Sequence, residues 1–281
     1  MQIVHHIKEL KAILLQQKEN GVSIGFVPTM GALHEGHLSL VRKCKQSNDI
    51  TVVSIYVNPA QFNNKNDLKS YPRDSERDCK LLSSEKCNIV FIPDDKEMYP
   101  VPDTREFNFG LMEQVMEGVH RTGHFNGVAK IVSKLFEAVE PDKAYFGQKD
   151  FQQLAIIRKL VKMNHYDIEI VACPIVREKN GLAMSSRNTL LTKEQRNAAP
   201  LIFKVIKEAS NNLTSHHSVK SVKEYVRNTI NSNKLLKLEY YEIVERNTLK
   251  PVSEISLKIP LTACIAVYAG NIRLIDNIDI N

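Results

Sequence analysis

Strand-like and helical runs alternate through the first two thirds of this 281-residue chain, and that alternation constrains its fold most strongly. Apolar side chains recur at helical spacing in the segment 128–139, which stops before Pro141. Five short apolar runs have the composition of strands, at residues 22–27, 50–57, 89–92, 144–146 and 168–173. The alternation is typical of βαβ units. It predicts an α/β fold with a Rossmann-like, doubly wound parallel sheet.

The last third of the chain has a different pattern. Thr192 and Gln195 form a capping box that opens a helix, and Pro200 should kink that helix or end it early. A second helix is expected from Ser218. The strands expected after it lie at 238–244, 263–269 and 272–275. These elements predict a smaller C-terminal α+β domain.

Composition limits the kind of protein. Lys and Arg exceed Asp and Glu by six, a mild surplus that suits small acidic substrates and lacks the clustered basic face of a nucleic-acid binder. The five cysteines are scattered and contain no C-x-x-C pair, which indicates a reducing compartment. No apolar run is long enough to span a bilayer, and the charged residues 1–18 do not resemble a signal peptide. We expect a cytoplasmic protein that binds neither membranes nor nucleic acid.

The segment 28–37, PTMGALHEGH, lies between a predicted strand and a predicted helix. Backbone N–H groups at a helix start have no partner inside the helix and carry partial positive charge, so an anion can bind there. His34 and His37 add side-chain donors whose charge can change near neutral pH. This turn predicts a site for a nucleoside triphosphate.

Two other interpretations of these histidines stay open. Zinc binding of the metalloprotease type needs histidines four residues apart on one helical face, and Gly36 breaks that spacing. A capping or core role is the usual one for a single histidine. Two histidines that flank a glycine in a strand-to-helix turn favour a functional role instead.

Other donors must complete a phosphate site, because neither common glycine-rich phosphate loop occurs in this chain. Lys149 follows a predicted strand, between Gly147 and the start of a helix at Asp150, and the switch-point rule lets this turn open on the same side as the histidines. Alternatively, Lys149 is an exposed lysine and Asp150 a plain N-cap. Residues 182–188, LAMSSRN, offer two hydroxyls and the guanidinium of Arg187 to phosphate oxygens, with a polar linker as the alternative.

Six motifs, in order along nearly the whole chain, resemble those of the pantothenate synthetases, the pantoate–β-alanine ligase family of the nucleotidyltransferase superfamily. They lie at residues 28–37 (PTMGALHEGH), 54–62 (SIYVNPAQF), 71–73 (YPR), 123–127 (GHFNG), 146–150 (FGQKD) and 184–188 (MSSRN). Each motif is moderately specific, and the six together are highly specific. The resemblance implies that ATP activates pantoate as pantoyl adenylate with release of pyrophosphate, and that β-alanine then attacks to give pantothenate and AMP.

The resemblance also implies which residues bind ATP. They are Met30, Gly31, Ala32, Leu33, His34, Glu35, Gly36, His37, Gly147, Gln148, Lys149, Asp150, Val176, Met184, Ser185, Ser186 and Arg187. The catalytic residues would be His34, His37, Lys149 and Arg187, which meet the phosphates as charge builds at the α-phosphorus. His37 is the expected proton donor.

Gln61 and Gln153 match the family's substrate contacts, and an amide can both donate and accept the hydrogen bonds that pantoate offers. Without the family, they would be a turn residue and a solvated helix position. The family uses Mg²⁺ with ATP, held mainly by phosphate oxygens. Many relatives carry an acidic residue at position 77, where this chain has Arg77, so a carboxylate ligand from this region would have to be Asp78.

We divide the chain near Asn188. Residues 1–187 should bind ATP and pantoate, and residues 188–281 should form a lid that excludes water from the adenylate. The family resemblance implies a homodimer. The rival functions are an adenylyltransferase with a different acceptor, and a non-catalytic nucleotide sensor or RNA-binding relative.

Overall fold

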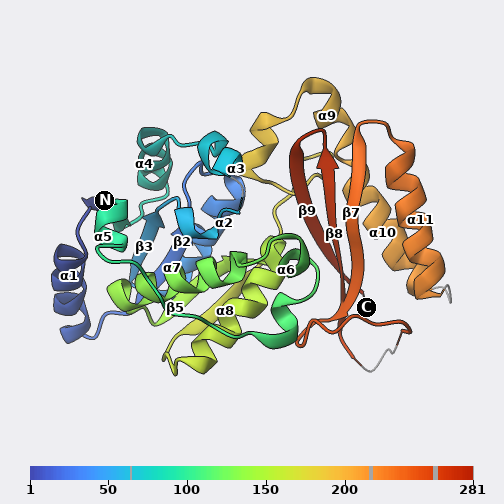
Figure 1. Ribbon diagram of the computed structural model, residues 1–281. Coiled ribbons are helices and arrows are strands. Elements are labelled where there is room, and N and C mark those ends of the chain that lie inside the picture. Colours follow the sequence, from blue (N-terminus) through green and yellow to red (C-terminus); the bar gives the residue numbers. More distant parts are fainter. Residues whose placement is uncertain (64, 215–217, 256–258, 281) are drawn as a thin grey trace. The chain divides into compact units, whose positions relative to one another are not determined.

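The computed structural model describes residues 1–63, 65–214, 218–255 and 259–280 (Figure 1). The strands are β1 (Gln2–Val4), β2 (Ile24–Thr29), β3 (Ile50–Ile55), β4 (Ile89–Phe91), β5 (Lys143–Gly147), β6 (Glu169–Cys173), β7 (Leu236–Glu245), β8 (Leu261–Ala269) and β9 (Ile272–Ile280). The α-helices are α1 (Ile7–Glu19), α2 (Glu35–Ser47), α3 (Lys65–Ser70), α4 (Ser75–Ser84), α5 (Asp95–Met98), α6 (Glu117–His120), α7 (His124–Val139), α8 (Phe151–Met163), α9 (Lys193–Ala198), α10 (Leu201–Thr214) and α11 (Val219–Ser232). Short 3-10 helices lie at η1 (Pro59–Gln61), η2 (Gly110–Glu113), η3 (Gln148–Asp150) and η4 (Ser186–Leu190).

These elements form two compact units, and each unit combines segments that are distant in sequence. The first unit contains residues 1–109, 121–148 and 156–174. The second unit contains residues 110–120, 149–155 and 175–281. The predicted division into residues 1–187, which bind ATP and pantoate, and residues 188–281, which form a lid, stays a prediction.

The first unit contains a six-stranded parallel sheet in the order β1-β4-β3-β2-β5-β6. All five strands predicted from apolar runs are present, and their ends differ from the predicted ones by at most two residues. The sequence pattern missed β1, because it has three residues and only Val4 among them is buried. The predicted Rossmann-like, doubly wound α/β class is confirmed.

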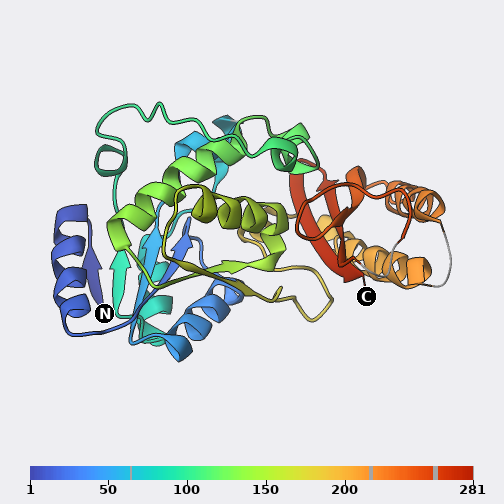
Figure 2. The ribbon, with the colours of Figure 1, turned by 90° about the horizontal axis from the view of Figure 1, so that it is seen from below.

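Helices cover both faces of this sheet. On one face, α2 and α4 pack through a buried apolar cluster that includes Val27, Val41 and Leu82. On the other face, Phe136 of α7 meets Phe26 of β2 edge-on, with 6.5 Å between ring centroids. Figure 2 shows the blue α2 and the green α7 on opposite sides of the strands. Strands covered on both faces must be apolar throughout, which explains why they read as continuous apolar runs.

The strand order reverses beside β2, which pairs with β3 on one side and with β5 on the other, where Gly25 lies opposite Lys143. The chain runs from β2 through β3 to β4 in one direction, and from β5 to β6 in the other. The carboxyl ends of β2 and β5 therefore form the switch point at which open α/β sheets bind ligands. β2 leads into the turn 30–37, and β5 leads into residues 147–150.

The second unit is built on an antiparallel sheet of β7, β8 and β9. One face of this sheet packs against α10 and α11 around a cluster of buried aliphatic side chains, as Figure 1 shows. The other face packs against residues 110–120 and the first turn of α8, with Met116 and Leu249 among the buried side chains. The predicted C-terminal α+β architecture is confirmed, and two earlier segments of the chain complete it.

The helix starts and stops predicted for the last third are also present. Thr192 and Gln195 form the capping box of α9. α9 ends before Pro200 and α10 begins after it, so the proline separates two helices. Ser218 caps α11 by accepting a backbone hydrogen bond. Among the described residues, no helix has both the length and the apolar character needed to cross a membrane.

The five cysteines are free thiols. Four of them are buried, and Cys79 on α4 is half-buried. Burial raises the pKa of both Cys44 and Cys87 to about 12.

Gln152, in the first turn of α8, holds the segment 110–120 in place. Its amide nitrogen donates to the carbonyls of Met112 and Val115 at 2.7 and 2.9 Å, and its amide oxygen accepts from the Glu117 N–H at 3.0 Å. The residue is 4% exposed, so its own amide group depends on these three backbone partners rather than on water.

We expect Gln152→Leu to lower the free energy of unfolding by about 1–3 kcal/mol, because three backbone groups, one of them in a buried hydrogen bond, lose this partner. The adjacent substitution Gln153→Ala is the matched control. Gln153 is half-buried, and its truncation should change stability by less than about 1 kcal/mol. Denaturant unfolding of both variants measures the difference, and equal stability of Gln152→Leu and the unmodified chain would contradict this role.

Candidate active site

The turn that follows β2 has a backbone that most residues avoid. Gly31 and Ala32 both have positive φ, at 77° and 49°. This conformation costs a residue with a side chain roughly 1 kcal/mol or more. A Cβ atom at Gly31 would lie 2.9 Å from Asp78 Oδ2 and 3.0 Å from Ile55 Cγ2. Glycine is therefore required at position 31 both for its φ and for the space it leaves.

Asp78 on α4 holds this turn. Its Oδ2 accepts the N–H of Ala32 and its Oδ1 accepts the N–H of Leu33, each at 2.8 Å. The neighbouring Arg77 donates from Nη1 to the Leu33 carbonyl at 3.0 Å. Hydrogen bonds to an ionised carboxylate are stronger than neutral ones, so they can offset the strain at Ala32.

The same contacts decide whether Asp78 suits a metal ion. Its side chain is 1% exposed and both of its oxygens accept backbone hydrogen bonds. Burial raises the pKa of Asp78, whereas the two N–H donors lower it. Within the described residues, no group of three or more His, Cys, Asp or Glu side chains is arranged to hold a metal. Asp78 therefore anchors the turn, and both of its oxygens already accept hydrogen bonds.

His34 and His37 form the start of α2. Nδ1 of His34 accepts from the Gly36 N–H at 3.1 Å, and Nδ1 of His37 accepts from the His34 N–H at 3.3 Å. The capping alternative is therefore correct for both histidines. It also supports a chemical role, because a neutral ring that accepts at Nδ1 carries its proton at Nε2 and donates from there. The two rings lie 4.1 Å apart between centroids.

Gly147 and Gln148 follow β5 at the switch point, beside the end of β2. A Cβ atom at Gly147 would meet nothing within 4 Å, so the backbone there is open to a ligand. Lys149 and Asp150 come next in the chain and belong to the second unit. Lys149 Nζ lies 3.9 Å from Asp150 Oδ1, and Asp150 is exposed. A shared site between Lys149 and the histidine turn stays a prediction.

Gln61 lies in η1, and its neighbours hold it from several directions. Its Nε2 lies 2.8 Å from Sδ of Met30, which opens the histidine turn, and its Oε1 accepts from Asn58 Nδ2 at 3.2 Å. Its backbone carbonyl accepts from His124 Nδ1 at 2.8 Å. Asn58 also donates to the Gly127 carbonyl at 3.1 Å. The first unit thus brings Gln61 to the turn that carries His34, as the predicted site requires.

The start of α7 approaches η1 closely. A Cβ atom at Gly127 would lie 2.2 Å from the Ala60 carbonyl oxygen and 2.8 Å from Gln61 Cα. The motifs 54–62 and 123–127 therefore form one brace around Gln61. Sequence reasoning found both motifs and missed this contact, because nothing in one sequence links residues more than sixty positions apart.

In the second unit, Val176 and Met184 close a short hairpin, with the Met184 N–H donating to the Val176 carbonyl at 3.0 Å. Ser185 then caps η4, since its hydroxyl accepts from the Arg187 N–H at 3.3 Å. Ser186 is buried, whereas Met184, Ser185 and Arg187 are half-buried. This segment is an ordered turn, which argues against the polar-linker alternative. Gln153 lies in the first turn of α8 and is half-buried.

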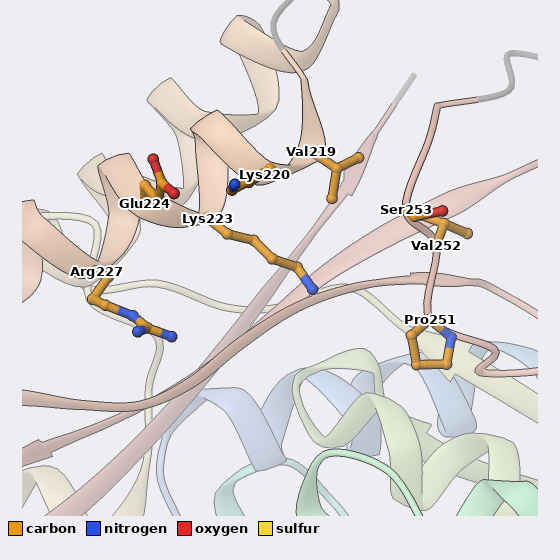
Figure 3. Close-up of a pocket in the computed structure, with 8 residues that line it drawn as sticks. All are labelled: Val219, Lys220, Lys223, Glu224, Arg227, Pro251, Val252 and Ser253. Atoms are coloured by element: carbon orange, nitrogen blue, oxygen red, sulfur yellow. The ribbon is translucent and has the colours of Figure 1, made fainter.

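A cavity of about 540 Å³ also lies in the second unit, between α11 and residues 251–253 (Figure 3). Its lining residues are Val219, Lys220, Lys223, Glu224, Arg227, Pro251, Val252 and Ser253. None of them is a predicted site residue. Lys223, one of its three cationic lining residues, is paired with Glu242 at 2.6 Å.

We expect Asp78→Asn to weaken the turn, because an amide nitrogen cannot accept the hydrogen bond that a carboxylate oxygen accepts. The variant should lose about 1–3 kcal/mol of unfolding free energy and also bind ATP less tightly. Added Mg²⁺ should not restore ATP binding, and calorimetry at several Mg²⁺ concentrations checks this. Full recovery at high Mg²⁺ would assign Asp78 to the metal. Asp74→Asn on the same helix is the control, since asparagine caps helices as well as aspartate does.

Gly127→Ala should push η1 away from α7, because the new methyl group meets backbone rather than a flexible side chain. We expect a loss of about 1–3 kcal/mol in unfolding free energy and a weaker affinity for pantoate through Gln61. Gly123→Ala is the control, since Gly123 has φ of 80° and nothing within 4 Å of an added Cβ. It should lose stability through strain alone, so equal pantoate affinity in the two variants would contradict the brace.

Comparisons with known proteins agree with this geometry. The family model described as pantoate-beta-alanine ligase matches residues 2–279. A pantothenate synthetase from Bacteroides fragilis is 51% identical over 278 residues, covering 99% of this chain and 98% of that one. One from Porphyromonas gingivalis is 48% identical over 278 residues, covering 99% of each.

Solved structures give the same result. Pantothenate synthetase from Thermus thermophilus has a TM-score of 0.93 and 37% identity, covering 100% of this chain and 99% of that one. Pantoate-beta-alanine ligase from Francisella tularensis, complexed with beta-gamma ATP and beta-alanine, has a TM-score of 0.84 and 34% identity, covering 99% and 97%. Sequence and structure match from end to end, and the chain belongs to the pantoate–β-alanine ligase family.

Proposed function

We propose that this chain condenses pantoate with β-alanine in an ATP-dependent ligation. ATP activates the pantoate carboxylate as pantoyl adenylate and releases pyrophosphate, and the β-alanine amine then displaces AMP to give pantothenate. The observation that carries this proposal is the switch point of the sheet. There the turn after β2 contains two histidines that cap α2, and the neighbouring end of β5 has an open backbone at Gly147. The relative from Francisella tularensis, whose structure is complexed with beta-gamma ATP and beta-alanine, supports the choice of substrates.

The two histidines that cap α2 suit the charge change of adenylate formation. Adenylyl transfer moves negative charge onto the leaving pyrophosphate, and donors that are already in place stabilise it without reorganisation. His34 and His37 have their Nδ1 atoms occupied within the turn, so in the neutral rings the proton lies on Nε2. We propose that both donate hydrogen bonds to phosphate oxygens. The proton donation expected of His37 requires its imidazolium form, in which Nδ1 is protonated and no longer accepts the His34 N–H. Lys149 and Arg187 add permanent positive charge.

Gln61 is the proposed contact for pantoate in the first unit. Its backbone is fixed by His124, and its side chain lies against Met30 and Asn58. An amide held in one orientation can discriminate a hydroxyl from a carboxylate oxygen by its donor and acceptor ends. We propose that Gln153 completes this recognition. No protein nucleophile is needed, because β-alanine brings its own amine.

The remaining predictions follow from the same proposal. Mg²⁺ enters bound to the phosphate oxygens of ATP, which are the hard ligands that this small ion prefers. Residues 188–281 act as a lid, the enzyme is a homodimer, and it works in the cytoplasm. Unchanged hydrogen exchange in the second unit when ATP and pantoate bind would contradict the lid.

A coupled assay of AMP release tests the function directly. Release should need both pantoate and β-alanine, whereas ATP–pyrophosphate exchange should need pantoate alone, because the adenylate forms before the amine attacks. Exchange with another acid in place of pantoate would favour the rival adenylyltransferase. Absence of exchange with tight ATP binding would favour the nucleotide sensor, and salt-sensitive tRNA binding would favour the RNA-binding relative.

Lys149→Ala should fold normally and lose adenylate formation by about a hundredfold, since one lost transition-state donor costs about 3 kcal/mol. Gln153→Ala is the comparison, because it should chiefly raise the pantoate concentration needed for half-maximal exchange. Steady-state exchange rates at varied ATP and pantoate separate the two effects. Equal activity of Lys149→Ala and the unmodified enzyme would remove Lys149 from the mechanism.

A further inference from the structure

Two adjacent residues of β9, Asp276 and Asn277, are polar in a strand whose neighbours are mostly apolar. They are only 4% and 6% exposed. Successive side chains of a strand point to opposite faces of its sheet. The apolar residues Leu274 and Ile280 pack into the cluster that contains α10, so Asp276 lies on that face and Asn277 on the opposite one.

Asn277 holds the backbone of Lys149. Its Nδ2 donates to the Lys149 carbonyl at 3.0 Å, although the two residues are 128 positions apart. The Asn277 N–H donates to Asp276 Oδ1 at 2.8 Å, so the two strand residues are themselves connected. Lys149 lies in a 3-10 turn between β5 and α8, and this hydrogen bond ties the turn to β9.

Asp276 holds the hairpin that leads to the Ser-Ser-Arg turn. Its two oxygens accept from Nη1 and Nη2 of Arg177, at 2.6 and 2.9 Å. Arg177 also donates to the Gly181 carbonyl at 3.1 Å and covers the Phe203 ring at 3.7 Å from the ring centre. Arg177 pairs with Ala183 across the hairpin, just before Met184.

β9 therefore binds two segments that are far apart in sequence: Arg177 on one face, through Asp276, and Lys149 on the other, through Asn277. Burial raises the pKa of Asp276, whereas Arg177 and the charge of Lys149 lower it. A buried bidentate ion pair is a weak source of net stability, because its desolvation offsets the attraction. It does fix geometry, since two parallel hydrogen bonds define the orientation of both partners.

We propose that Asp276 and Asn277 are positioning residues for adenylyl transfer: they hold Lys149 and the hairpin 176–184 in one rigid frame on β9. This inference rests on the proposed function, because it gives the held segments their purpose. The C-terminal sheet then has a positioning role. It sets where the ammonium group of Lys149 and the Ser185–Arg187 turn stand relative to each other.

A double-mutant cycle with Asn277→Ala and Lys149→Ala tests this. Alone, Asn277→Ala should lower the rate of pantoate-dependent ATP–pyrophosphate exchange by about tenfold or more, with the KM for pantoate unchanged, because a small misplacement of a catalytic group is costly. In the Lys149→Ala background, the same substitution should change the rate by less than about twofold, since there is no ammonium group left to misplace. Equal effects in both backgrounds would overturn the inference.

Thr262→Val is the matched control. Thr262 is fully buried on the neighbouring strand β8 and donates to Asp279 Oδ1 at 3.0 Å, so this variant also loses one polar contact of the same sheet. Its melting temperature should fall, and its exchange rate should stay within about twofold of the unmodified enzyme. A tenfold loss in this control would mean that general weakening of the sheet, rather than positioning, causes the effect.

Amide hydrogen exchange adds a readout that needs no substrate. Asn277→Ala should speed exchange at residues 148–151, and Asp276→Asn should speed it at residues 176–184. Thr262→Val should change neither segment. Unchanged protection in the first two variants would overturn the inference even if the enzyme proved inactive with pantoate. Absence of pantoate-dependent activity in the unmodified enzyme would instead contradict the proposed function.

Discussion

The position of β2 in the parallel sheet is the constraint on which the rest of the first unit depends. β2 pairs with β3 on one side and with β5 on the other, so the chain leaves in opposite directions from two neighbouring strand ends. Connecting segments must diverge there, and the space between them is available to a ligand. The other features of the proposed site in this unit lie beside that space. The histidine turn begins at the end of β2, and the backbone at Gly147 is open at the end of β5.

Buried polar side chains hold the loops of both units in place. Asp78, Asn58 and Gln152 each pair with backbone groups of a segment that is distant in sequence. Such contacts contribute little net stability, but leaving their partners unpaired would be costly, so they specify one arrangement of the loops. Gln152 and Asn277 do so in the second unit, where Asp276 pairs instead with the side chain of Arg177. The two units use the same physical means to fix loops that apolar packing alone would leave adjustable.

The sequence was most informative where a short-range pattern controls the structure. Apolar runs located the buried parallel strands, and the capping box at Thr192 marked a helix start that is present. Both patterns act within a few residues, which is why a single sequence reveals them. The turn with His34 was also recognisable, because its glycines and histidines lie next to one another and between a strand and a helix.

Long-range contacts were the part that sequence could not supply. Residues 110–120 join the sheet of the second unit through side chains without a clear period, so no pattern marked them as part of it. Asp78 was considered only as a metal ligand, because its two backbone partners lie more than forty residues away. For the two histidines, the sequence presented helix capping and a chemical role as alternatives. The same hydrogen bonds cap the helix through Nδ1 and, in a neutral ring, leave the proton on Nε2, so the two roles are compatible.

The burial of the thiols has a practical consequence for anyone who handles this protein. Thiolates, not thiols, react with alkylating reagents and oxidants, and a pKa of about 12 leaves almost none at Cys44 or Cys87 near neutral pH. Cys79, next to Asp78 on α4, is the least buried of the five. Burial and the charge of Asp78 raise the pKa of Cys79 as well, so a maleimide dye should react slowly with it and more slowly still with the buried thiols. Cys79 adjoins Asp78, the anchor of the histidine turn, so the reaction rate of the thiol would report on how firmly the turn is held.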